Sequence, residues 1–447
     1  MKNLQVVLDS DLCVGCGACA AAEPGLKLHL HPEKLMYEPD GPGGERAASV
    51  CPAIQVDFAG LQQRLFPGKD PTSVGVVEGV YLAQSLNLGR NLRASSGGLI
   101  KELLLYYLSR DDVDGAIVLG HRGGLDYEPR LIRTAAEVDA LPGSVYHSLS
   151  FEKAIRLLEE NEGRFVVVAI PCQLEGLYQY VYKYRPELKE RIFATIGLIC
   201  GWTYSHHALR AISEFSRTNY DDLKDVTYRG GGPVGPLRLI TSDVEKRVHR
   251  RINFGYQVAF DRSFNVPRCH LCIDHTNFLA DVVVGDAWLP STVGTKSGVS
   301  IVVCRRQETV EHLQELRNRQ RIRLVEVGVD DVVESQSRRV AFGDFSYAYA
   351  DYQRAQGRHV PDMVGPNRAA AKLRPESEVA TFHRTNERKL RLQRARRYRA
   401  LWRRKLTVEF WGYSYRYIRW FSIRVLKVKS LLGLRKEVPR EKLQDFV

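Results

Sequence analysis

The chain has 447 residues, a hydrophobic content of 44% and a formal net charge of +13. This length allows two or more domains with cores of their own, and the mixed composition excludes an intrinsically disordered chain. No uninterrupted run of about 18 apolar residues occurs, so a membrane-spanning helix is not expected. The opening MKNLQVVLDSDLC lacks a signal-peptide pattern, which predicts a cytoplasmic protein.

Near the amino terminus, the segment CVGCGAC places three cysteines at a Cys-x-x-Cys-x-x-Cys spacing: Cys13, Cys16 and Cys19. Such a loop wraps three thiolates around one iron–sulfur cluster, and its glycines permit a close approach of the backbone. In two-cluster ferredoxins the run continues to a cysteine before proline, but here Glu23 occupies that position. The ligand for a second cluster is therefore missing from this run.

The fourth ligand of this first cluster is expected from Cys51, which precedes Pro52 and is the only other cysteine before the core. We predict one 4Fe–4S cluster on these four cysteines, in a ferredoxin-like module over residues 1–66. A zinc ion held by four thiolates is the alternative, although zinc sites usually use two separated pairs.

After a turn-rich linker at 67–73, strand-like runs alternate with amphipathic segments of helical length. The expected strands are 76–83, 116–120, 165–170 and 192–199, and the expected helices are 99–109, 151–161 and 174–184. This alternation predicts an α/β core with an at least partly parallel sheet. Shorter strand-like runs follow within 226–251, 282–284 and 300–304.

Two loops could face a phosphate group. Ser95, Ser96, Gly97 and Gly98 directly precede the first expected helix, whose free N–H groups and dipole would attract an anion. Serine and glycine there also serve as a plain cap, and the residues alone favour that role. Arg229 precedes three glycines, but a hairpin loop is the favoured interpretation. No G-x-G-x-x-G or Walker pattern supports a Rossmann site or nucleotide hydrolysis.

A second set of cysteines follows the expected strands. Cys172 and Cys200 come at the ends of two successive strand-like runs, and Cys269 and Cys272 form a Cys-x-x-Cys pair. If the two strands are parallel neighbours, their carboxyl ends lie about 5 Å apart, where open α/β sheets bind ligands. A close cysteine pair in a chain without a secretory leader more often binds a metal or cluster than forms a disulfide. We predict a second 4Fe–4S cluster on these four residues.

Other roles for the cysteine pair stay open. His270 and His275 flank it, so a Cys/His zinc site is one alternative, although we favour positions around the cluster or at the surface for both. Thiol–disulfide exchange would need a reactive pair near a helix start. The ninth cysteine, Cys304, lies in the apolar run SIVVC and is expected to pack as a small buried hydrophobic residue.

Four separated blocks carry a family resemblance: IPCQ, CGW, RCHLC and LADVVVGDAW. In this order they resemble the coenzyme F420 hydrogenase/dehydrogenase beta-subunit family, which includes the plant 7-hydroxymethyl chlorophyll a reductase. The resemblance spans about residues 75–306 and implies an N-terminal-type region at 75–150 and a C-terminal-type region at 151–340. It also implies FAD beside a 4Fe–4S cluster that is held by the cysteines of these blocks.

The resemblance assigns contacts to this flavin. It implies that the segment from Ser95 to Gly98 contacts FAD, and that Ser144, Tyr146 and Ser148 lie near the flavin ring. A turn before the next helix is the alternative for the latter three. Asp286, after the strand-like run 282–284, would hydrogen-bond flavin or substrate or act as a catalytic acid, with a plain turn as the alternative.

Much of the positive charge lies after residue 383, and residues 373–447 are expected to form a basic, aromatic helical tail. Trp, Tyr and Phe interleaved with Arg and Lys suit docking on the inner face of a membrane or on an acidic protein. A plain helical cap on the core is the alternative. Nucleic-acid binding is not expected, because no recognised module accompanies the basic residues.

These features predict an oxidoreductase with two 4Fe–4S clusters and FAD, which together convert between one-electron and two-electron chemistry. A ferredoxin or another redox partner would exchange electrons with the first cluster. The resemblance implies that FAD would act on a small substrate such as F420, a tetrapyrrole or another oxidised molecule. One alternative is an electron-transfer beta subunit of a larger hydrogenase or dehydrogenase complex. Another is a non-catalytic zinc-binding scaffold with a membrane- or nucleic-acid-binding tail.

Overall fold

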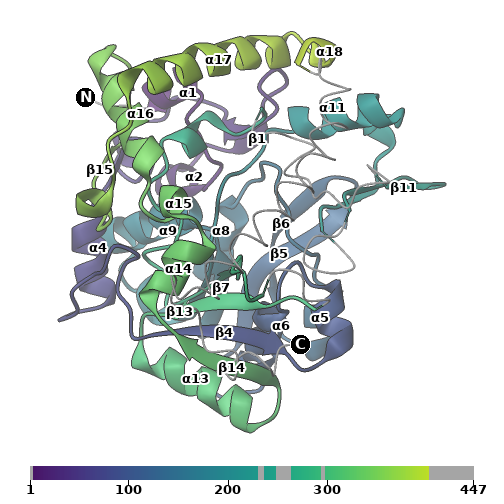
Figure 1. The fold of residues 1–447 in the computed structure, drawn as a ribbon, viewed down its shortest axis with the longest axis vertical. Coiled ribbons are helices and arrows are strands. Elements are labelled where there is room, and N and C mark those ends of the chain that lie inside the picture. The colour runs from purple at the N-terminus through teal and green to yellow at the C-terminus, as the bar shows by residue number, and fades with distance from the viewer. Residues whose placement is uncertain (1–3, 230–235, 248–262, 293–296, 402–447) are drawn as a thin grey trace, which may run out of the picture.

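The computed structural model describes residues 4–229, 236–247, 263–292 and 297–401 (Figure 1). Its central element is an eight-stranded sheet in the order β14-β4-β13-β12-β8-β7-β5-β6. The strands are β4 (Gly79–Ser85), β5 (Gly115–Gly123), β6 (Asp126–Ile132), β7 (Phe165–Ala169), β8 (Ile192–Leu198), β12 (Val282–Asp286), β13 (Ser300–Cys304) and β14 (Ile322–Val327). Strands β12, β8, β7 and β5 run parallel, and the outer pairs are antiparallel. The predicted α/β core with a partly parallel sheet is confirmed.

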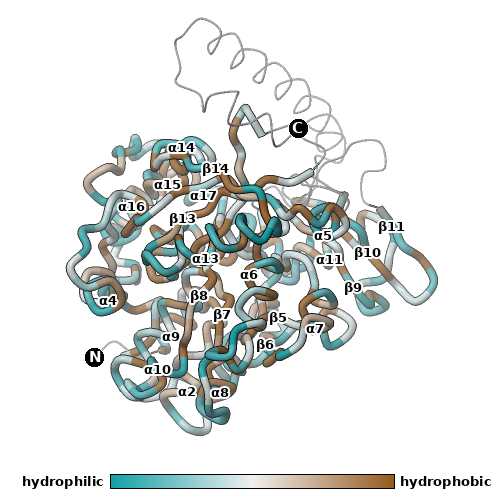
Figure 2. The backbone as a smooth tube through the Cα atoms, turned by 90° about the horizontal axis from the view of Figure 1, so that it is seen from below, coloured by the Kyte–Doolittle hydropathy of each residue, from teal (hydrophilic) through white to brown (hydrophobic). Residues whose placement is uncertain are grey.

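Alternate residues of each strand face two helical layers, because successive side chains of a strand point to opposite faces. In β4, Val80 and Leu82 join a core with helices of one face, whereas Tyr81 and Ala83 join the core of the other. The first face carries α4 (Phe58–Leu65), α8 (Glu152–Glu160) and α9 (Pro171–Tyr184), and the second carries α6 (Leu99–Tyr107) and α13 (Gln307–Asn318). The backbone is correspondingly hydrophobic along the middle strands β7 and β8 (Figure 2).

The amino-terminal region is built from short elements that pack on the core. They are α1 (Leu4–Asp9), α2 (Ala18–Ala22), β1 (Leu28–Leu30), β2 (Tyr37–Pro39), α3 (Glu45–Ala48) and β3 (Gln55–Val56), followed by α4. Helix α2 contacts α8 and α9, and β3 pairs in parallel with the distant β15 (Asp362–Met363). This region therefore shares its packing with the core, and its ferredoxin-like character stays a prediction.

A smaller antiparallel sheet of β9 (Asp225–Thr227), β10 (Arg238–Ile240) and β11 (Glu245–Arg247) shares a separate core with α11 (His207–Ser216). The chain then continues through α16 (Asp344–Ala355), α17 (Glu376–Arg394) and α18 (Tyr398–Leu401). The other short helices in the described ranges are α5 (Leu88–Arg93), α7 (Ala135–Ala140), α10 (Leu188–Arg191), α14 (Val329–Ser335), α15 (Arg338–Ala341), η1 (Tyr220–Asp222), η2 (Pro267–His270) and η3 (Arg368–Ala370).

The basic tail is described only in part. Its first helix, α17, packs on α16, and Arg394 at its end forms an ion pair with Asp11. The more aromatic stretch of the tail, at 402–447, lies outside the described residues. Among the helices that the structure describes, none has both the length and the apolar composition needed to cross a membrane.

Candidate functional site

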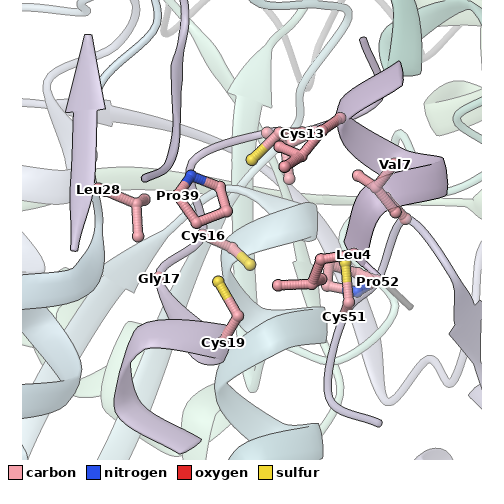
Figure 3. A pocket seen from close by; sticks show the side chains of 13 residues that line it. Leu4, Val7, Cys13, Cys16, Gly17, Cys19, Leu28, Pro39, Cys51 and Pro52 are labelled. Atoms are coloured by element: carbon pink, nitrogen blue, oxygen red, sulfur yellow. The ribbon is translucent and has the colours of Figure 1, made fainter. Parts of the chain in front are cut away.

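The first four cysteines gather around one pocket next to α1 (Figure 3). Cys13, Cys16, Cys19 and Cys51 line it together with apolar side chains such as Leu4. Cys13 is half-buried and the other three cysteines are buried. The structure therefore brings together the four residues that the sequence predicts as ligands of the first cluster.

Two glycines let the loop of this first set dock on the start of α8. Gly15 and Gly17 have φ values of +70° and +78°, a region that other residues rarely adopt. A Cβ atom on Gly15 would lie 2.3 Å from the carbonyl oxygen of Leu149, and one on Gly17 would lie 2.3 Å from the Cα atom of Glu152. The two glycines thus permit close packing of the loop on the start of α8, and a close approach of the backbone to a cluster stays a prediction.

Burial changes the acidity of these thiols. It raises the pKa of Cys13, Cys16 and Cys51 to about 12, and the pKa of Cys19 well above its ordinary value. Alone, such thiols stay protonated at neutral pH, whereas a bound metal centre would stabilise their thiolates. Four convergent thiols are the donor set of a 4Fe–4S cluster and also of a four-thiolate zinc ion.

The second four cysteines gather at the carboxyl edge of the parallel strands. Strands β7 and β8 are parallel neighbours, as predicted. Cys172 lies in the first turn of α9, so the predicted helix begins earlier than 174, and Cys200 follows β8. Cys269 lies in η2, and Cys272 is two residues beyond it. Burial is the main cause that raises the pKa of the Cys172 thiol. The nearby thiols of Cys200, Cys269 and Cys272 raise it further.

Hydrogen bonds tie the loops of this second set to one another. The N–H group of Cys200 donates to the carbonyl of His275 at 3.0 Å, and Nδ1 of His275 lies 2.7 Å from the carbonyl oxygen of Cys200. The N–H group of Thr203 donates to Sγ of Cys269 at 3.3 Å. The ring of His270 packs on Phe382, with centroids 4.9 Å apart. Both histidines are buried, and His275 is bonded to the backbone of Cys200, whereas a place for His270 around a cluster stays a prediction.

Two alternatives for the cysteine pair can be weighed against this geometry. Burial raises the pKa of both Cys269 and Cys272, whereas thiol–disulfide exchange relies on a lowered pKa, so exchange is not supported. Within the described ranges, no three Cys, His, Asp or Glu side chains form a group that could hold a single metal ion. Whether the cysteines bind an iron–sulfur cluster or zinc stays a prediction, which metal analysis of the purified protein would test.

Helix α9 joins the two sets. Cys172 lies in its first turn, and a Cβ atom on Gly176 would lie 2.8 Å from Sγ of Cys16. Positions four apart on a helix have Cβ atoms about 5–6 Å from each other. One turn of α9 therefore separates the second set from the first, and the two predicted clusters are neighbours.

A Gly176→Ala substitution is expected to lower iron occupancy of the first set selectively. Alanine favours helix formation by about 1 kcal/mol over glycine, so a loss would come from the methyl group displacing Sγ of Cys16. Iron analysis checks this, with Gly89→Ala in α5 as control, because a Cβ there comes no closer than 3.5 Å to its neighbours. An unchanged iron content in Gly176→Ala would mean that iron binding by the first set does not depend on the present position of Cys16.

Several residues of the predicted flavin site meet near the carboxyl end of β12. Arg229 forms a two-fold hydrogen-bonded ion pair with Asp286, at 2.7 and 2.9 Å, and donates to the hydroxyl of Tyr146 at 3.3 Å. The hydroxyl of Ser95 accepts from the N–H group of Ser144 at 3.3 Å. The sequence reasoning missed the pairing of Arg229 with Asp286, since nothing local in the sequence indicates it.

The glycines before α6 have a clear packing role. The N–H group of Gly97 donates to the Ser300 hydroxyl at 3.0 Å, and a Cβ atom on Gly97 would lie 2.6 Å from the Ala83 carbonyl oxygen. The Ser96 hydroxyl also lies 3.0 Å from that of Ser300. Gly98 caps the helix with φ at +76°. The capping alternative is therefore present in the structure, and the flavin or phosphate contact stays a prediction.

Ser148 and Cys304 both make contacts that stabilise the fold. The hydroxyl of Ser148 accepts from the N–H group of Tyr37 at 3.0 Å, so it faces the amino-terminal region, and a flavin contact for it stays a prediction. Cys304 is fully buried in β13, and burial raises the pKa of its thiol to about 12. The prediction that Cys304 packs as a small hydrophobic residue is confirmed.

Two protein-family models match the chain. The model for the N-terminal part of the coenzyme F420 hydrogenase/dehydrogenase beta subunit matches residues 80–156, and the model for the C-terminal part of that beta subunit matches residues 162–329. Together they cover more than half of the chain. They include the second cysteine set, whereas the first set lies before them.

Individual proteins are similar to the chain at low identity. An F(420)H(2) dehydrogenase subunit from Methanosarcina mazei is 25% identical over 64% of this chain and 78% of its own length. "Coenzyme F420-dependent sulfite reductase" of Methanocaldococcus jannaschii is 24% identical over 70% of this chain, but only 48% of its own length is covered. A chain of the F420-reducing [NiFe] hydrogenase complex from Methanosarcina barkeri shares the fold, with a TM-score of 0.51 and 18% identity over 66% of this chain and 98% of that one.

Proposed function

Because this chain belongs to the coenzyme F420 hydrogenase/dehydrogenase beta-subunit family, we propose that it is an iron–sulfur flavoprotein that passes electrons between a redox protein and a small organic substrate. The family resemblance predicted from four sequence blocks is confirmed, and with it the redox class. The observation that supports the finer proposal most is the gathering of eight cysteines into two sets of four that lie one turn of α9 apart.

Each group of residues has a proposed task. The two cysteine sets would each hold one 4Fe–4S cluster, and the loops that carry Ser95, Ser144 and Tyr146 would hold FAD. When bound, the clusters supply one-electron transfer and the flavin supplies hydride transfer. Asp286 is fixed by Arg229 at the carboxyl edge of the sheet, where ligands of open α/β sheets bind. We propose that it orients the flavin or the substrate.

Coenzyme F420 is the first substrate to test, because the names of several relatives contain it. The chain would be reduced anaerobically with dithionite, freed of excess reductant and mixed with oxidised F420. Reduction of F420 in proportion to the protein supports this substrate. Reoxidation by another acceptor, but not by F420, would leave the electron-transfer role and remove F420 as the substrate.

A subunit role in a larger complex is the second candidate. It is supported by relatives named as hydrogenase beta subunits and by the fold shared with a chain of a hydrogenase complex. Purification of the tagged chain from its native cells distinguishes the two. Co-purification with stoichiometric redox subunits would favour the complex, and activity of the isolated chain with a soluble electron carrier would favour a stand-alone reductase.

We further propose that electrons enter beside the first cysteine set through a basic ridge that runs from α17 to α18. The ridge consists of six exposed arginines: Arg388, Arg391, Arg394, Arg396, Arg397 and Arg399. Arg394 pairs with Asp11, two residues before Cys13, and Arg396 donates to the Pro32 carbonyl. The ridge thus adjoins the loop of the first set, and its charge suits an electron carrier with an acidic face.

Charge reversal on this ridge tests the docking of an acidic carrier. In Arg388→Glu/Arg391→Glu, the rate of reduction by reduced ferredoxin at low ionic strength is expected to fall roughly tenfold, and the difference is expected to shrink as salt is added. A control with the same charge change, Arg122→Glu/Arg319→Glu, alters exposed arginines of β5 and of the α13 end. Equal rates in both variants, or loss only of binding to anionic vesicles, would overturn the carrier assignment.

A further inference from the structure

A buried ion pair lies between the two cysteine sets. Glu175 of α9 and Arg268 of η2 are 1% and 2% exposed, and Oε2 of Glu175 lies 3.6 Å from Nη2 of Arg268. Burying two charges is costly unless hydrogen bonds and other charges compensate for the lost water. This pair is therefore a feature that packing alone does not explain.

The arginine adjoins both sets. Arg268 directly precedes Cys269, and its Nη2 group donates to the carbonyl of Pro52, the neighbour of Cys51, at 3.4 Å. Burial opposes its charge, but Glu175 and then the thiols of the second set raise its pKa overall. Burial is the main cause that raises the pKa of the Cys51 thiol. The charge of Arg268 acts in the opposite direction and lowers this pKa. One cation thus acts on thiols of both sets.

The glutamate also lies close to both cysteine sets. Glu175 lies one helical turn after Cys172 and directly before Gly176, the residue packed against Cys16. Among the described residues, no group donates a hydrogen bond to either of its carboxylate oxygens. The carboxylate also acts electrostatically on Cys16, Cys172 and other thiols of the second set. Glu175 thus acts on thiols of both sets and on Arg268, and it also acts on the buried carboxyl of Asp274.

We propose that the Glu175–Arg268 pair sets the reduction potentials of both cysteine-held clusters together, an inference that rests on the function proposed above. A cluster bound by four thiolates gains negative charge on reduction, and its potential depends on nearby charge and hydrogen bonding. In a buried site of low dielectric, the guanidinium favours the reduced form, and the glutamate opposes it in its ionised form. Since the pair lies between the sets, each substitution acts on both clusters.

The test is a potentiometric titration of the intact anaerobic protein, followed by electron paramagnetic resonance, in four forms: wild type, Arg268→Met, Arg268→Lys and Glu175→Gln. Arg268→Met is expected to lower both potentials, and Glu175→Gln is expected to raise both. Each change is expected to be about tenfold in the equilibrium constant for one-electron reduction, which corresponds to about 59 mV. Arg268→Lys keeps the charge and should return both potentials toward the wild-type values.

A matched control and a double variant distinguish an effect of this ion pair from a general effect of changing a buried charge. Glu102→Gln removes a fully buried carboxylate of α6 that pairs with Arg90 at 2.6 Å, and it should leave both potentials unchanged. If Arg268→Met fails to fold, Glu175→Gln alone, which preserves side-chain shape, decides the outcome. In the double variant Glu175→Gln/Arg268→Met, the opposite shifts should largely cancel.

The failure modes differ. If the wild type holds two clusters and the variants shift neither potential, or only one of them, the shared role of the pair is overturned and the proposed function stands. If the wild type holds no iron–sulfur clusters, both proposals fail together. Iron and sulfide analysis of the wild type, made before the titration, separates these results.

Discussion

In Cys16→Ser, the protein is expected to lose about half of its iron and to keep its flavin, because a serine hydroxyl replaces one of four thiolates in the first set only. Cys16 lies in the pocket shared by the first set, whereas the residues proposed for FAD lie near the carboxyl end of β12. Electron delivery from a protein carrier should fall with the iron. Iron, acid-labile sulfide and released flavin are measured on the same anaerobic preparation.

The control for this substitution is Cys304→Ser, which changes a buried thiol outside both sets and should keep all the iron. Equal loss of iron and flavin from Cys16→Ser would contradict the division into two sites. Because Cys16 packs against Gly176 of α9, such a result would point to coupling through that helix.

The second large effect is expected from Cys269→Ser, which should lose iron and FAD together and abolish substrate reduction. Cys269 begins a segment that runs through the loop at His275 and strand β12 to Asp286. Within that loop, the buried carboxylate of Asp274 accepts hydrogen bonds from the N–H group of Phe278 at 3.0 and 2.9 Å. A disturbed second set would therefore shift the edge where Asp286 meets Arg229.

The measurement compares flavin fluorescence after denaturation and iron content in Cys269→Ser and Cys16→Ser. Retention of full flavin in Cys269→Ser would show that the second set and the flavin residues fold independently. A stable fold in both variants is checked by thermal unfolding, so that a general loss of structure is not mistaken for a loss of cofactor.

The parallel middle of the sheet was predictable because its strands are short, continuously apolar runs bounded by turns, as β7 and β8 show. The edge strands β6 and β14 were missed because half-exposed edges mix polar and apolar residues. Strand β6 even contains Pro129, which removes an N–H donor and is tolerated only at an edge. Edge strands are thus the part of this fold that local patterns specify least.

In the site, spacing and strand ends were enough to group the cysteines, because the Cys-x-x-Cys runs are local and the ends of parallel strands meet at one edge. The ion pairs Arg229–Asp286 and Glu175–Arg268 could not be predicted, because each joins segments far apart in the sequence. The packing of Gly176 on Cys16 is a tertiary contact of the same kind. It is what makes the two sets neighbours.

The most direct test of the central claim is metal and flavin analysis of the full chain after anaerobic purification. Two four-cysteine sets predict about eight irons and matching sulfide per chain, and the proposed function adds one FAD. About four irons would mean that only one set holds a cluster. Zinc in place of iron, with no flavin, would contradict the account and leave a zinc-binding scaffold.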